Sequence, residues 1–120
     1  MSDSNTVLDL AIRQLVAYNN RDTDGFCACF HPDVTVLDAD GTVTLQGMAA
    51  FRERYGTMFA THREVIGTVT SRVHLEPHVV EQEHWSRTHA TTGETARGEV
   101  LVRYTAGDGL IRWVQFFRAP

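Results

Sequence analysis

The feature that most constrains the fold is a change of hydrophobic period after Thr61. From there to the end of the chain, apolar and polar residues alternate with a period of two, which is typical of strands with two unlike faces. The turn signals that interrupt the alternation are Glu76-Pro77-His78, Thr92-Gly93-Glu94 and Ala106-Gly107-Asp108-Gly109. The second half of the chain is therefore predicted to form consecutive strands joined by short turns. These strands are Glu64–Leu75, Val79–Thr88, Ala96–Thr105 and Leu110–Arg118.

The first half of the chain carries the helical spacing of i, i+3 and i+4 instead. A first helix is predicted from Asn5 or Thr6 to about Asn20, and a third from Met48 to about Ala60. Between them, the side chain of Thr23 or Asp24 can cap a short second helix. The predicted apolar stripes are Leu8, Ala11, Ile12, Leu15 and Tyr18, with Gln14 at the edge, then Phe26, Cys29 and Phe30, then Met48, Phe51, Tyr55, Met58 and Phe59.

A strand pair is predicted between the second and third helices. The sequence His31-Pro32-Asp33 ends the second helix, because the residue before a proline favours extended geometry. A strand over Val34–Asp38, a turn at Asp38-Ala39-Asp40-Gly41 and a returning strand over Thr42–Leu45 follow.

Asp38 is the most informative residue of this strand pair. It shares one strand face with Val34 and Val36, so if the valines face an apolar interior, the carboxylate points there too. A carboxylate on an apolar face is either a catalytic group or a residue that caps the hairpin.

Helices gathered early and strands late predict an α+β fold. In this fold one curved antiparallel sheet of mixed strand order wraps around three N-terminal helices, and a cone-shaped cavity remains between the layers. A chain of 120 residues forms one domain, which buries roughly two thirds of its unfolded surface in a single core.

The charge balance argues against some partners. The chain has 11 Lys and Arg against 15 Asp and Glu, a net charge of −4, and no basic stripe to neutralise phosphates, so nucleic acid is not an expected partner. No apolar run reaches the roughly 18 residues of a membrane span, and Met1–Asn5 lacks the parts of a signal peptide. We expect a cytoplasmic protein.

Four motifs extend over nearly the whole chain. They are Asn19-x-x-Asp22-x-Asp24-Gly25 leading into Phe30, Asp38 at a strand end, Gly47 followed by Phe51-Arg52-x-x-Tyr55, and Gly109-x-Ile111 before an aromatic last strand. Together they resemble the nuclear transport factor 2-like superfamily, in particular its SnoaL-like and ketosteroid isomerase-like members. The resemblance implies one such domain over residues 1–120. Because this superfamily hosts isomerases, cyclases, dehydratases, epoxide hydrolases and non-catalytic binding modules, it does not decide the function.

The resemblance also implies roles for single residues. In ketosteroid isomerases an aspartate base moves a proton next to a carbonyl, while a tyrosine and a protonated aspartic acid hold the enolate oxygen. Asp38 matches the base, and Tyr55 matches a tyrosine that supports the oxyanion site. Gln14 stands in place of the oxyanion tyrosine and Val100 near the position of the acid. Since glutamine donates one such hydrogen bond and valine none, efficient steroid isomerisation is not expected.

The strand Val79–Thr88 has two unlike faces, and the resemblance implies that Gln82 and His84 line the cavity. A one-residue slip of register would bring Glu81 and Glu83 there instead. In the implied arrangement His84 assists Asp38 in acid–base chemistry, or it has only a structural hydrogen bond. The implied pocket wall comprises Phe30, Phe51, Tyr55, Phe59, Trp113 and Phe117, with Gln14 and Gln115 as further polar groups.

Two functions fit the sequence. The first is a cofactor-independent isomerase, cyclase, dehydratase or hydrolase that acts on a hydrophobic small molecule with Asp38 as general base. The second is a non-catalytic ligand-binding or accessory module. Members of the superfamily commonly dimerise through the outer sheet face, so the resemblance implies a homodimer anchored by Trp85 and Leu101. We expect no metal site, because no histidine pair has ligand spacing and Cys27 and Cys29 point apart on a helix.

Overall fold

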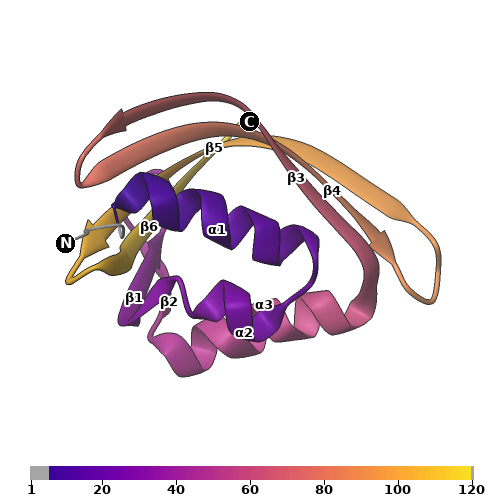
Figure 1. Ribbon diagram of the computed structural model, residues 1–120. Helices are drawn as coiled ribbons and strands as arrows, with labels where there is room; N and C mark the ends of the chain where they lie inside the picture. Colours follow the sequence, from indigo (N-terminus) through magenta and orange to yellow (C-terminus); the bar gives the residue numbers. More distant parts are fainter. Residues whose placement is uncertain (1–5, 120) are drawn as a thin grey trace.

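The computed structural model describes residues 6–119, along which it has three helices and six strands (Figure 1). The helices are α1 (Val7–Asn19), α2 (Thr23–Cys27) and α3 (Met48–Thr61). The strands are β1 (Phe30–Leu37), β2 (Val43–Gln46), β3 (His62–Leu75), β4 (His78–His89), β5 (Thr95–Gly107) and β6 (Leu110–Arg118). The predicted α+β class is confirmed.

Within the described residues, the strands form one sheet in the order β2-β1-β6-β5-β4-β3. Neighbouring strands are antiparallel except β1 and β6, which run parallel. Figure 1 shows β3, β4 and β5 arching over α1, with α2 and α3 on the same concave side of the sheet. The helices therefore cover one sheet face, and the core lies between the two layers.

The second helix is shorter than its sequence pattern predicts. Asp22, rather than Thr23 or Asp24, is the N-cap, and its side chain accepts a hydrogen bond of 3.0 Å from the Gly25 N–H. The helix ends at Cys27, and Phe30 begins β1 instead of continuing the helix. The Phe26 and Phe30 rings still pack together with centroids 4.9 Å apart. Phe26 and Phe30 are therefore buried side by side, as the predicted longer helix would also have placed them.

The buried face of α1 also differs from the predicted stripe. Its buried residues are Val7, Leu10, Ala11, Gln14 and Ala17, whereas Ile12 is 44% exposed. Gln14 lies within this face rather than at its edge, because its Nε2 donates a 3.0 Å hydrogen bond to the Ala11 carbonyl. Thr6 caps the helix, and the alternative cap, Asn5, lies outside the described residues.

Two side-chain contacts hold α1 beneath the sheet. At its start, the Val7 N–H donates to both carboxylate oxygens of Glu76, in the turn between β3 and β4, at 3.0 and 3.2 Å. At its end, Asn19 accepts a 2.7 Å bond from the Gly67 N–H and donates a 3.2 Å bond to the Gly67 carbonyl. Because β3 is an edge strand, Asn19 satisfies backbone groups that lack a neighbouring strand.

Aromatic rings form the part of the core nearest to α2 and α3. The rings of Phe26 and Phe51 are stacked with centroids 5.6 Å apart, and Tyr18 meets Phe59 edge-on at 5.6 Å. No helix among residues 6–119 has the length and apolar character needed to cross a membrane.

Candidate functional site

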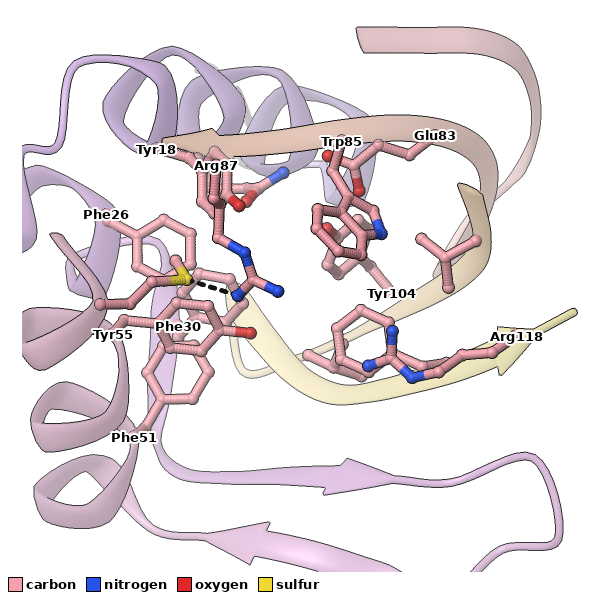
Figure 2. Close-up of a pocket in the computed structure, with 15 residues that line it drawn as sticks. Tyr18, Phe26, Phe30, Phe51, Tyr55, Glu83, Trp85, Arg87, Tyr104 and Arg118 are labelled. Carbon is pink, nitrogen blue, oxygen red and sulfur yellow. Dashed lines mark hydrogen bonds between the residues drawn. The ribbon is translucent and has the colours of Figure 1, made fainter. Parts of the chain in front are cut away.

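A cavity of about 120 Å³ lies between the helices and the concave face of the sheet (Figure 2). A wider outer cleft of about 540 Å³ shares part of its wall. The shared residues are Tyr55, Met58, Arg87, Phe116 and Arg118. The inner cavity therefore opens into the outer cleft, which forms its mouth.

The side of β4 that faces the cavity is the one opposite to the prediction. Glu83, Trp85 and Arg87 line the inner cavity. Gln82 and His84 point to the outer face, where the Gln82 Nε2 donates a 2.6 Å bond to Glu99 and the His84 Nε2 lies 3.1 Å from the same carboxylate. The prediction that Gln82 and His84 line the cavity is thus wrong, and the alternative register is the observed one.

The pairing of β4 with its neighbours explains this register. Glu83 pairs with Val100 on β5, and Val100 pairs with Arg118 on β6, so all three side chains lie on the cavity side. Both faces of β4 carry charged and polar residues, so alternation alone could not identify the inner one.

The same correction applies to β6. Val114, Phe116 and Arg118 line the cavity, whereas Trp113 and Phe117 lie on the outer face and are each 37% exposed. The third predicted residue of this strand, Gln115, donates a 3.0 Å hydrogen bond to the Asp38 carbonyl. None of these three belongs to the inner wall.

Several other predicted site residues do line the cavity, namely Gln14, Phe30, Phe51, Tyr55 and Val100. Phe59 is buried behind this wall, where it packs on Tyr18 and Phe26. Trp85 lies in the cavity wall, so its predicted place on the outer sheet face is wrong. Leu101, the other predicted dimer anchor, is on that outer face and 45% exposed.

Asp38 lies at the mouth and not in the inner cavity. Its side chain is exposed and borders the outer cleft. Its backbone N–H donates to the Thr42 carbonyl and its carbonyl accepts from the Gly41 N–H, both at 2.9 Å, as hairpin residues do. Asp38 shares the outer cleft with Val36, as alternation predicts, but β1 ends at Leu37, so the carboxylate lies in the exposed hairpin and not in the apolar interior.

Glu83 is the carboxyl group that the inner cavity contains. No hydrogen bond or ion pair reaches its carboxylate from any described residue. Burial, together with the smaller effect of the negative charge of Glu81, raises the pKa of Glu83 to about 7. Glu81 itself is 1% exposed and receives the Arg72 Nη2 at 2.7 Å and Nε at 2.8 Å. Glu81 is therefore paired with an arginine, whereas Glu83 faces the cavity without a partner among the described residues.

Three tyrosines bring hydroxyl groups to the same space. Burial raises the pKa of Tyr18 to about 12, with a further contribution from the charge of Glu83. Burial likewise raises the pKa of Tyr55 and that of Tyr104. All three phenols keep their protons near neutral pH and can donate hydrogen bonds to a ligand oxygen.

Glycines within two strands make room for this arrangement. A Cβ at Gly67 on β3 would fall against the Glu83 carboxylate, and one at Gly98 on β5 against the Trp85 indole. A glycine inside a strand often marks a close approach of this kind, so Gly67 and Gly98 are a sequence signal that could have identified the inner face of β4.

The described residues contain no group of three or more His, Cys, Asp or Glu side chains arranged to hold a metal ion. Cys27 and Cys29 are buried free thiols, and burial raises the pKa of each.

Comparison with known proteins identifies relatives of this fold. The model of the SnoaL-like domain family matches residues 11–114. Among curated protein sequences, none matches the chain significantly.

Several solved structures share the fold although their sequence identity to this chain is low. A cystatin-fold protein from Novosphingobium aromaticivorans has a TM-score of 0.84 at 23% identity, covering 94% of this chain and 98% of that one. The Δ5-3-ketosteroid isomerase from Mycobacterium sp. has a TM-score of 0.81 at 20% identity, covering 94% and 92%. A Mycobacterium tuberculosis protein in complex with estradiol-17β-hemisuccinate has a TM-score of 0.80 at 17% identity, covering 92% and 91%.

These structural relatives agree with the topology described above, a curved mixed sheet around three helices. The family model covers most of the sequence, from the first helix to the last strand. The chain belongs to the SnoaL-like domain family, within the nuclear transport factor 2-like superfamily.

Proposed function

We propose that this SnoaL-like protein is a cofactor-independent acid–base enzyme, with Glu83 as the group that transfers the proton. The observation that carries the proposal is a carboxyl group with a pKa of about 7, unpaired within the described residues and facing an aromatic cavity. A group with this pKa is about half ionised at neutral pH, so it can both accept and return a proton.

The chemistry that suits this site begins with enolisation of a carbonyl compound. Ionised Glu83 takes a proton from the carbon next to the carbonyl, and the C–H electrons move into the enolate. A hydroxyl of Tyr18, Tyr55 or Tyr104 donates a hydrogen bond to the enolate oxygen. In a β,γ-unsaturated substrate Glu83 then returns the proton to the γ carbon, and the double bond moves into conjugation. In a substrate with a second carbonyl group, the enolate carbon instead attacks that carbonyl carbon, the C=O π electrons move to its oxygen, and this oxygen takes the proton from Glu83.

A hydrophobic substrate is supported by the aromatic wall and by two structural relatives. One of them is a ketosteroid isomerase, and the other was solved with a steroid hemisuccinate. The inner cavity is smaller than the roughly 300–1,000 Å³ of typical ligand pockets, so most of a polycyclic ligand would occupy the outer cleft.

The base predicted from the resemblance, Asp38, borders that outer cleft and is the competing candidate. Both candidates can be tested by deuterium exchange next to the carbonyl of 2-tetralone and of 5-androstene-3,17-dione, followed by NMR. We expect Glu83→Gln to lower kcat/KM by roughly 10²- to 10⁴-fold, and Asp38→Asn to lower it less than about tenfold. The matched control is Glu99→Gln, which removes a glutamate charge from the outer face.

The native pH profile is part of the same test. Because the ionised form is the base, kcat/KM should rise with pH and level off above about pH 7. A loss of activity in Asp38→Asn with full activity in Glu83→Gln would assign the base to Asp38 and reject the proposal.

The alternative function is a non-catalytic ligand-binding or accessory module. It is favoured by one observation: the Gln14 amide, at the position of the family's oxyanion tyrosine, already donates to the Ala11 carbonyl. Ligand binding without deuterium exchange by the native protein on any ketone tested would favour this alternative. For either function we propose a homodimer through the outer sheet face, with Leu101 and its neighbour Phe117 as anchors.

A further inference from the structure

We infer that the mouth of the cavity binds an anionic group, so that the ligand is an apolar molecule that carries a carboxylate. This inference rests on the proposed ligand-binding role of the cavity, and it is independent of the reaction at Glu83.

The first observation is the environment of Arg87. Its guanidinium lies 4.4 Å from the centre of the Trp85 ring, and its Nη1 donates a 3.1 Å bond to the Met58 sulfur, which is a weak acceptor. Figure 2 shows this guanidinium pointing into the space between Trp85 and Tyr55. Its position is thus held by an aromatic ring and a thioether, and the side chain borders both the inner cavity and the outer cleft.

The second observation is a further arginine on β6, which is separated from β4 by one strand of the same sheet. The Arg118 guanidinium lies 4.9 Å from the centre of the Phe116 ring, and Arg118 borders both the inner cavity and the outer cleft, as Arg87 does. Across residues 6–119, no carboxylate lies within ion-pair distance of Arg87 or Arg118. Two guanidinium groups therefore face one space without a protein counter-ion.

Other arginines of the chain do have carboxylate partners. The Arg72 Nη2 lies 2.7 Å from Glu81, and the Arg52 Nη1 lies 2.7 Å from Asp24. Arg87 and Arg118 have no such partner among the described residues, and a planar guanidinium is well suited to bind a carboxylate.

The remaining charged groups of the cleft leave it positive. Arg54 and His62 also border it, and Asp38 is the carboxylate among its lining residues. The positive charges of Arg54, Arg118 and Arg87 all oppose the effect of burial on the pKa of Tyr55, so the three arginines converge on that phenol. Glu83 lies deeper, where no arginine offsets the shift of its pKa.

The test compares two probes of the same shape, 2-naphthoate and the neutral 2-naphthamide. Affinities are measured by calorimetry at pH 6 and low salt, where naphthoate is ionised and Glu83 is mostly protonated. We expect the native protein to bind naphthoate at least about tenfold more tightly than the amide. In the double variant Arg87→Gln, Arg118→Gln this preference should disappear while the affinity for the amide changes less than about threefold. Circular dichroism checks that the variant is folded.

The matched control is Arg97→Gln, which removes the same charge from the exposed outer side of β5 and should keep the preference. Equal or tighter binding of the amide by the native protein would overturn the inference. Failure of naphthoate to bind up to its solubility limit, or an equal loss in the control, would overturn it too. Glu83→Gln should lose deuterium exchange and keep the preference for the acid, so failure of the anion site and failure of the proposed chemistry give different results.

Discussion

At the scale of single residues, Glu83 links the stability of the protein to its chemistry. Its pKa is about 7 in the folded protein and 4.5 in an unfolded chain. Below pH 4.5 both states hold the proton. Between pH 4.5 and 7 the folded state still holds it after the unfolded state has released it, so this contribution to stability falls as pH rises and is lost above pH 7. Above pH 7 the ionised Glu83 carboxylate therefore lowers the free energy of unfolding, by at most about 3 kcal/mol.

This linkage predicts that Glu83→Gln stabilises the fold at alkaline pH. The neutral amide removes a buried charge, so we expect the free energy of unfolding to rise by about 1–3 kcal/mol at pH 8 and to change little at pH 4.5. Urea denaturation of both proteins at both pH values measures the effect, with Glu99→Gln as the control. A variant less stable than the native protein at pH 8 would show that the charge is compensated in the folded state.

At the scale of elements, the end of α1 and the edge strand β3 depend on each other. Asn19 exchanges two hydrogen bonds with the backbone of Gly67, and Gly67 lies beside the Glu83 carboxylate. The contact therefore positions the end of the helix and the edge strand next to Glu83.

Asn19→Ala removes both partners of Gly67, so we expect a loss of about 1–3 kcal/mol in stability and faster hydrogen exchange of the Gly67 amide. Asn20→Ala is the matched control, because the Asn20 side chain bonds only to Val16 within its own helix, on the exposed surface. If the two variants lose the same stability, the contact between helix and edge strand is unimportant.

At the scale of the whole molecule, the sheet has one covered and one open face. Leu101 pairs with Phe117 on the open face, and Trp113 lies on the same side of β6 as Phe117. Leu101 is 45% exposed, and the two aromatic residues are each 37% exposed. An apolar strip of this kind suits the proposed pairing with a second copy of the chain.

Sedimentation velocity at tens of micromolar protein is expected to give a dimer for the native chain and a monomer for Leu101→Glu. Ile12→Glu changes an equally exposed apolar residue on α1 and should leave the dimer intact. A native monomer, or dissociation by both substitutions, would contradict this interface.

The sequence by itself determined the order, type and approximate bounds of the elements, because period and turn chemistry are local properties. The bounds of β6, Leu110–Arg118, are those that alternation predicts, and α3 begins at Met48 as predicted. The order of elements also predicted the curved sheet around three helices, and the family motifs agreed with it. They also identified wall residues such as Phe51 and Tyr55, whose helix presents a single apolar face.

Only the tertiary structure decided which face of each strand is the inner one. The two faces of β4 are both polar, and Glu81 becomes an inward residue because Arg72 on the neighbouring strand neutralises it. Asp38 borders the outer cleft together with Val36, but its side chain is exposed because β1 ends at Leu37 and the hairpin begins there. In each case the burial of a charged group depends on how the strands pair and where they end in the folded sheet, which a local pattern does not contain.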